Sequence, residues 1–304
     1  MDQNAARAAR RAVEWPTLGM ISACYALWVL GLAAAAQGFL ICGLVLLVAA
    51  VAMHSSLQHE VLHGHPTRSP ALNELLVALP LGLAVPYRRF RDLHLRHHDN
   101  TRLTDPYDDP ETFYLARGRH EGLPRLMRAA LAFNNTLAGR MLIGPALACY
   151  AFWHEEARRL RRSREVRRAW ALHVAGLAVL VAILLAAGAV PLWLYAAGVA
   201  YPAMSVLMVR TFAEHDARED VAHRTAIVER GSLLGVLFLN NHLHYVHHRF
   251  PRIPWYRLPA LYRSQGGKLR EENGDHVYSG YGEIFRRFLF RARGPVVHPF
   301  LKTD

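Results

Sequence analysis

Four long apolar runs, arranged as two pairs, restrict this chain more than any other feature of its sequence. The first pair covers residues 17–36 and 39–57, and the second covers residues 170–188 and 192–212. Within each pair, a short turn nearly free of charge joins the two runs. A run of about 20 apolar residues forms a helix of roughly 30 Å, the thickness of the hydrocarbon core of a bilayer. The sequence therefore predicts two helical hairpins that cross a membrane.

Charged residues lie outside these runs, at the ends of the hairpins. The formal net charge is +12, although hydrophobic residues make up 52% of the chain. Arg7, Arg10 and Arg11 precede the first hairpin, and an arginine-rich stretch at residues 158–168 precedes the second. Because positive charge is retained on the cytoplasmic side of a membrane, we expect both termini and residues 58–168 to face the cytoplasm. The predicted location is the inner (cytoplasmic) membrane, with residues 58–168 on its cytoplasmic face.

A signal peptide or a nucleic-acid-binding surface would account for the basic residues less well. A signal peptide has a shorter apolar segment, and a second apolar run follows here almost at once, so we expect a retained hairpin. A nucleic-acid-binding protein would also be basic, but it needs no apolar runs of membrane length, and no known nucleic-acid motif occurs. The arginines of residues 158–168 most simply contact lipid headgroups, or alternatively dock an acidic ferredoxin.

The remaining apolar stretches are not expected to span. Residues 72–86 are too short and contain two prolines, which favours an interfacial or re-entrant segment. Residues 129–153 are interrupted by polar side chains, which favours an amphipathic segment in the interface over a fifth span. The predicted fold is thus a single all-α integral-membrane domain over residues 1–304, with interfacial helices and a cytosolic cap made of residues 58–168 and 213–304.

The second constraint is an uneven distribution of 18 histidines. The motif H-x-x-H-H occurs twice, as His94, His97 and His98 and as His244, His247 and His248. At this histidine content one such motif is expected roughly 0.06 times by chance, and two only about 0.002 times. Positions i, i+3 and i+4 lie on one face of a helix, so each motif points three imidazoles at one place.

Two further groups of histidine follow the predicted hairpins. His59 and His63 form H-x-x-x-H just past the first hairpin and share a helix face, whereas His54, five residues before His59, points elsewhere. His215 leaves the second hairpin on the same side as His59 leaves the first. The metal-ligand candidates are therefore His59, His63, His94, His97, His98, His215, His244, His247 and His248.

Nine imidazoles are enough for two metal ions with four or five ligands each. Neutral imidazole suits iron, zinc, copper and nickel. Glu60 and Glu214 lie beside proposed ligands, where they either fix imidazole tautomers or remain solvated carboxylates. Asp105, Asp108 and Asp109 alternate with prolines, which favours a turn-rich loop.

These motifs, in this order around two membrane hairpins, resemble the membrane fatty acid desaturase superfamily. That group is similar to membrane alkane hydroxylases and carotenoid ketolases. The resemblance runs from about residue 40 to residue 290. It is carried by four stretches: His59–His65, His94–His98, Thr104–Pro110 and Asn240–His248.

The resemblance implies a di-iron centre with two irons per chain, dioxygen as co-substrate and an external electron donor. It implies that His215 is the ligand after the later hairpin, and that Asn240 or Asn241 lies near the metal, often held through water. The sequence departs from the pattern in carrying His65 and His242 beside the motifs.

The expected reaction is oxidation of an unactivated C–H bond in a long-chain lipid, which requires a redox metal because side-chain acids and bases cannot perform it. We favour desaturation of a fatty acyl chain because of the resemblance. The alternative is a hydroxylase or monooxygenase of alkane, lipid or carotenoid. A membrane metal carrier or sensor is disfavoured because the predicted spans are almost purely apolar. The sequence has no haem-binding His-Pro-Gly-Gly, flavin or nicotinamide fingerprint, so electrons are expected from a separate protein such as ferredoxin with its reductase.

Overall fold

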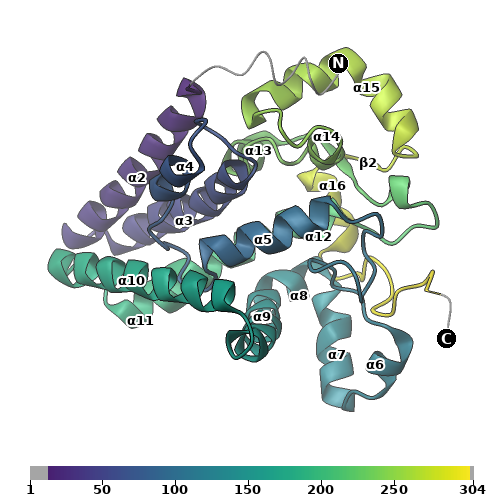
Figure 1. Cartoon of the computed structure of the whole chain (residues 1–304), viewed down its shortest axis with the longest axis horizontal. Coiled ribbons are helices and arrows are strands. Elements are labelled where there is room, and N and C mark those ends of the chain that lie inside the picture. Colours follow the sequence, from purple (N-terminus) through teal and green to yellow (C-terminus); the bar gives the residue numbers. More distant parts are fainter. Residues whose placement is uncertain (1–12, 302–304) are drawn as a thin grey trace. The chain divides into compact units, whose positions relative to one another are not determined.

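A computed structural model describes residues 13–301. The chain divides into two compact units, one made of residues 1–91 and 146–207 and the other of residues 92–145 and 208–304. Figure 1 labels the elements, most of which are helices. The arginines predicted to anchor the first hairpin, Arg7, Arg10 and Arg11, lie outside the described residues.

The first predicted hairpin is confirmed as helices α2 (Trp15–Ala36) and α3 (Leu40–Leu62). Both are long and apolar enough to cross a membrane. The two helices approach closely at Gly31 and Gly43, where a Cβ added to Gly43 would lie 2.7 Å from the carbonyl oxygen of Gly31. Small residues allow two helix backbones to approach closely, and such close packing favours the association of helices in lipid. Helix α3 continues beyond the predicted end at residue 57.

The second predicted hairpin is also confirmed. Helix α10 (Arg164–Ala187) begins at Ser163, whose hydroxyl accepts the Val166 N–H, and ends at Gly188 with a left-handed φ of 59°. The returning span, Leu192–Glu214, consists of α11 (Leu192–Tyr195), the π-helix η1 (Ala196–Ala200) and α12 (Tyr201–Glu214).

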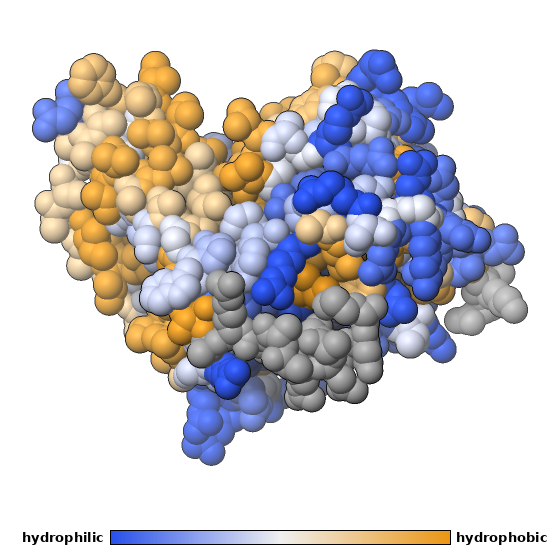
Figure 2. Space-filling view, turned by 90° about the horizontal axis from the view of Figure 1, so that it is seen from above, coloured by the Kyte–Doolittle hydropathy of each residue, from blue (hydrophilic) through white to orange (hydrophobic). Residues whose placement is uncertain are grey.

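The lipid-facing character of the spans is visible in their exposed side chains. Val29, Ile41, Val45, Val174 and Leu185 are all more than half exposed. Figure 2 shows hydrophobic side chains gathered on the surface that α2, α3 and α10 form. Exposed apolar surface of this kind is unfavourable in water and favourable in a bilayer.

The rest of the first unit surrounds these hairpins with α4 (Pro70–Leu76), the start of α5 (Tyr87–His98) and α9 (Gly144–Leu160). Residues 72–86, predicted to be interfacial or re-entrant, form the end of α4 and then irregular turns. His173, the polar interruption of α10, bonds through its Nε2 to the carbonyl oxygen of Leu83 at 2.8 Å. A polar side chain inside a span is therefore satisfied by the backbone of these turns.

The second unit contains the end of α5, the end of α12 and the first residues of α9, together with shorter elements that lie entirely within it. They are α6 (Arg117–Glu121), α7 (Arg125–Asn134), α8 (Leu137–Leu142), the 3-10 helix η2 (Val221–His223), β1 (Ile227–Arg230), α13 (Ser232–Leu237), α14 (His244–Arg249), η3 (Trp255–Arg257), α15 (Leu258–Glu272), β2 (Val277–Gly280) and α16 (Tyr281–Phe288). Residues 129–153, predicted to be one amphipathic segment, are broken among α7, α8 and α9. Apart from α2, α3, α10 and Leu192–Glu214, residues 13–301 contain no helix long and apolar enough to span.

The two strands form a small parallel sheet in which Ile227 pairs with Val277. Its buried side chains join a core that includes Leu243, Val246 and Leu258. This core fixes α14, because the sheet and the histidine-rich helix share it. The sheet was not predicted from the sequence, but the fold is otherwise helical as expected.

Candidate metal centre

The two H-x-x-H-H motifs form helix faces in the second unit, as their spacing predicts. His94, His97 and His98 lie on the last turns of α5. The second motif occupies the short helix α14. Two backbone hydrogen bonds tie α14 to the sheet: Tyr245 N–H donates to the Ala226 carbonyl, and Val228 N–H donates to the His242 carbonyl. The β1 strand therefore sets the position of the second histidine face.

Four imidazoles converge in this unit, one from α5, one from the end of α12 and two from α14. We call His97, His215, His244 and His248 the four-histidine cluster. The Nε2 atom of His215 lies 3.0 Å from that of His97 and 2.9 Å from that of His244. The Nε2 atoms of His248 and His244 are 3.1 Å apart. One nitrogen from each of the four rings lies within 4.8 Å of all the others.

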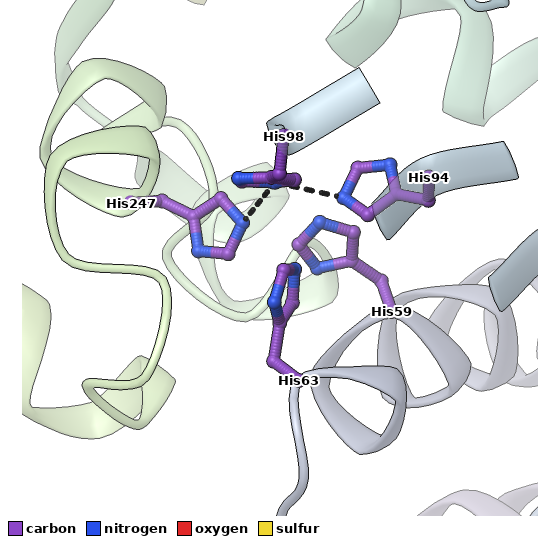
Figure 3. Close-up of side chains that lie close together, drawn as sticks. All are labelled: His59, His63, His94, His98 and His247. Atoms are coloured by element: carbon purple, nitrogen blue, oxygen red, sulfur yellow. Dashed lines mark hydrogen bonds between the residues drawn. The ribbon is translucent and has the colours of Figure 1, made fainter. Parts of the chain in front are cut away.

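Three more imidazoles of the same unit converge on one another. They belong to His94, His98 and His247, which we call the three-histidine cluster. The Nε2 atom of His98 lies 3.0 Å from that of His94 and 3.1 Å from that of His247. Figure 3 shows these contacts as dashed lines. The prediction that each motif points three imidazoles at one place was therefore wrong: the i and i+4 rings enter one cluster, and the i+3 ring points to the other.

His59 and His63 belong to the first unit, at the end of α3. Their ring centroids are 5.1 Å apart, and Figure 3 shows both rings projecting from the same side of the helix. The predicted common face of H-x-x-x-H is therefore formed. His54, which the spacing placed on a different face, lies instead against the ring of Tyr25.

Carboxylates bind the Nδ1 atoms of two candidate ligands, on the side of the ring opposite Nε2. The Nδ1–H of His97 donates to Asp109 Oδ1 at 2.7 Å, and the Nδ1–H of His94 donates to Glu111 Oε1 at 2.8 Å. Such a bond fixes the tautomer, so that Nε2 carries the lone pair that binds metal. Asp109 is buried and is thus more than the member of a turn-rich loop that the sequence indicated.

The side chains of Glu214, at the end of α12, and of Asn241 contact the imidazole of His244. Its Nδ1 lies 3.3 Å from both Asn241 Oδ1 and Glu214 Oε1. The Asn241 amide donates to Glu214 at 2.9 Å, and Arg210 forms an ion pair with the same carboxylate. Glu214 is therefore a buried partner of a candidate ligand and not a solvated carboxylate.

The structure separates the two asparagines that the sequence left as alternatives. Asn241 is buried beside His244, whereas the Asn240 amide donates to the Trp255 carbonyl. The extra histidines lie in neither cluster. His65 Nδ1–H donates to Glu14, and His242 packs against Gly231.

His65 is part of a third group that the sequence did not predict. Glu14, Glu60 and His65 are all buried, and one atom from each lies within 4.8 Å of the others. Both oxygens of Glu14 are within 2.9 Å of His65 Nδ1, and Glu60 lies 3.9 Å from its Nε2. Glu60 is therefore buried next to His65 and is not a solvated carboxylate. Glu14 precedes the first span, where no spacing rule relates it to the histidines.

Burial favours the neutral form of four of these rings. Burial lowers the pKa of His98 to about 2, and burial together with neighbouring rings lowers the pKa values of His215, His244 and His248 well below the usual 6.5. Burial also acts to lower the pKa of His97, but the carboxylates Glu111 and Asp109 outweigh it and raise the value to about 8. The carboxylates around His97 therefore stabilise a positive charge at this place, and a bound metal cation would provide such a charge.

The donor geometry fits a first-row metal. A metal–imidazole distance of about 2.1 Å places neighbouring ligands of an octahedron about 3.0 Å apart. The Nε2 separations in the two clusters are 2.9–3.1 Å. All seven donors are imidazole nitrogens, a set that suits iron, copper, zinc and nickel and disfavours calcium or magnesium.

Four candidate membrane spans and two groups of converging imidazoles that could hold metal ions define a histidine-rich membrane protein. The sequence model of the fatty acid desaturase family matches residues 30–278, which is most of the chain, and the chain belongs to that family. Family membership makes it a lipid-modifying oxidoreductase. The search of curated proteins returned no match.

Proposed function

We propose that the protein is a membrane di-iron desaturase that uses dioxygen to introduce a double bond into a fatty acyl or similar long-chain lipid. The four-histidine cluster carries this proposal, because four rings from three separate segments converge at metal-ligand spacing without any acidic ligand among them. An all-imidazole site with its Nε2 atoms already oriented suits a redox metal. Family membership supplies the lipid as substrate class.

The proposed ligand set is the nine histidines that the sequence predicts. We assign the four-histidine cluster to one iron and the three-histidine cluster to the second, and His59 and His63 remain ligands predicted from the sequence. Asn241 stands beside the four-histidine cluster, with its side-chain oxygen 3.3 Å from His244 Nδ1 and its amide bonded to Glu214. When bound, two irons supply the oxidising power for removal of hydrogen from an unactivated methylene.

The chain's own groups prepare the site for this chemistry. Asp109 and Glu111 hold His97 and His94 in the tautomer that presents Nε2, and Glu214 with Asn241 does the same for His244. Burial of His94, His97, His244 and Asn241 excludes water from the donor atoms. A dry site protects a strongly oxidising centre from side reactions.

Lipid profiling tests the proposal directly. Cells that express the chain should contain unsaturated lipids that cells expressing a His97→Ala, His244→Ala variant lack, and the variant should still reach the membrane. Alcohols in place of alkenes would make the chain a hydroxylase of the same family. Identical lipid and hydrocarbon profiles, with the wild-type protein present and loaded with iron, would refute the enzyme assignment.

A further inference from the structure

A basic cavity of the second unit lies outside the histidine clusters. It has a volume of about 880 Å³ and is lined by β2, by α16 and the segment that follows it, and by residues just after α12. In Figure 1, α16 and the segment that follows it are drawn in yellow, and β2 is labelled. The sequence brings four arginines to the cavity within a short stretch: Arg286, Arg287, Arg291 and Arg293.

The positive charge of this cavity is largely uncompensated. Its carboxylates already have partners, since Tyr114 donates to Asp216 at 2.7 Å and Arg270 pairs with Asp275 at 2.7 Å. Within residues 13–301, no ion pair joins Arg218, Arg286 or Arg291 to a carboxylate, and Arg286 and Arg291 are exposed. The cavity therefore presents guanidinium groups that are ready to bind carboxylates from outside.

The wall of the cavity is joined to a candidate metal ligand. Asp216 follows His215 directly in the chain. The guanidinium of Arg293, which is almost fully buried, donates to the carbonyl oxygens of Phe212 and His215 and lies 3.8 Å from Asp216. The cavity thus approaches the four-histidine cluster through the backbone of one of its members.

Aromatic side chains complete the surface. Phe290 is 81% exposed beside Arg291, and Phe285 lines the cavity as well. Arginine and aromatic residues are the types enriched where proteins bind one another. Clustered charge of one sign raises the association rate with a partner of opposite charge, which suits a short-lived complex with a small interface.

We propose that this basic cavity is the docking surface for an acidic one-electron carrier protein. This inference rests on the proposed function, which requires electrons from outside. In each turnover two reduced carriers give up two electrons, the methylene pair gives up two hydrogen atoms, and dioxygen with two protons becomes two water molecules. The carboxylates of the carrier pair with Arg286 and Arg291, and the electrons enter beside His215.

The test uses the full-length, iron-loaded protein in detergent with a [2Fe–2S] ferredoxin and its reductase. In the Arg286→Glu, Arg291→Glu variant, the KM for ferredoxin should rise about tenfold while kcat changes little, because two exposed charges at the rim are reversed. The salt dependence of kcat/KM should flatten as well. The Arg286→Lys, Arg291→Lys variant keeps the charge and should stay near wild type.

Two controls separate docking from damage and from failure of the proposed function. Arg119→Glu, Arg125→Glu reverses two exposed charges of the same unit outside this cavity and should leave the ferredoxin KM unchanged. In a single turnover, protein reduced chemically without oxygen and then mixed with lipid and dioxygen needs no carrier. The charge-reversal variant should match wild type there, whereas absence of product from wild type itself would refute the proposed function.

Three results would overturn the docking proposal. One is an unchanged ferredoxin KM in the charge-reversal variant. Another is an equal loss in the single turnover, which would show damage to the centre. The third is a raised KM for the lipid with an unchanged KM for ferredoxin, which would assign the cavity to the headgroup of the substrate.

Discussion

The Nε2 atom of His97 lies 3.0 Å from the Nε2 atom of His215, although 118 residues separate the two in the chain. His97 comes from an H-x-x-H-H motif, whereas His215 belongs to no motif and simply ends the second hairpin. Their contact joins the last turn of α5 to the end of α12 within the second unit. A histidine without a spacing signature is thus placed among the candidate ligands by tertiary structure.

The first prediction follows from that contact. His215→Ala should abolish activity and reduce the iron content from about two to about one or fewer per chain, because a converging imidazole is lost. Elemental analysis and turnover measure both effects. His120→Ala is the matched control, since His120 lies outside both clusters and lines a different cavity. Full iron and turnover in His215→Ala would require a new ligand set, with His65 or His242 as replacements to examine.

The second prediction concerns the metal itself. Protein purified in detergent should contain about two irons per chain, because nine imidazoles provide four or five ligands for each ion. Removal of the metal with a chelator should abolish turnover and lower the melting temperature, since the clusters join separate segments of the chain. One tightly bound zinc ion and no iron would contradict the di-iron assignment.

The spans and the two histidine faces could be predicted from the sequence because both depend on local periodicity. A run of apolar residues determines the length of α2, and the histidine spacing determines which side of α14 carries the imidazoles. Neither depends on contacts with other parts of the chain. His215 has no such spacing and was predicted instead by comparing where the two hairpins end and from the family resemblance. The predictions were poorer where a segment is broken by tertiary contacts, as at residues 129–153.

The side chains that bind the candidate ligands are positioned by turns, and the periodicity of a sequence does not predict how a turn folds. Asp109 reaches His97 because the loop after α5 folds back over 12 residues. Asn240 and Asn241 are neighbours, yet the left-handed backbone at Asn240, with φ of 56°, directs the two side chains to different partners. The alternation of aspartate and proline after the first H-x-x-H-H motif was the available signal, and it was interpreted as a turn alone.

The third prediction concerns topology. Each hairpin has a turn nearly free of charge and ends that carry the arginines, so both chain termini and all the histidine motifs should face the cytoplasm. Reporter fusions at residue 304 and at the turn near Gly188 should therefore give opposite signals. The same signal from both fusion sites would rule out the arrangement of two hairpins.

The fourth prediction concerns electrons. With a nicotinamide cofactor alone, the purified protein should not turn over, because its sequence has no fingerprint for that cofactor, for flavin or for haem. Addition of ferredoxin and its reductase should restore turnover on a lipid substrate. Product formation at the full rate without a protein carrier would show that the chain accepts electrons by itself.

The fifth prediction isolates Asp109 as a positioning residue. Asp109→Asn keeps the size of the side chain but removes the charge that accepts the Nδ1–H of His97, so the affinity for iron should fall about 10- to 100-fold. Chelator competition measures that affinity.

Asp109 also accepts the N–H of Thr104, so a purely structural role would show itself as a lower melting temperature of the metal-free protein. Asp109 accepts from His97 and the Glu111 N–H with Oδ1 and from the Thr104 N–H with Oδ2, whereas asparagine has one acceptor oxygen, so we expect a modest fall in that temperature beside the larger loss of iron affinity. Asp108→Asn is the control, since the side chain of Asp108 is half-exposed and pairs with the exposed Arg102. Equal iron affinity in the two variants would show that the carboxylate of Asp109 does not tune His97.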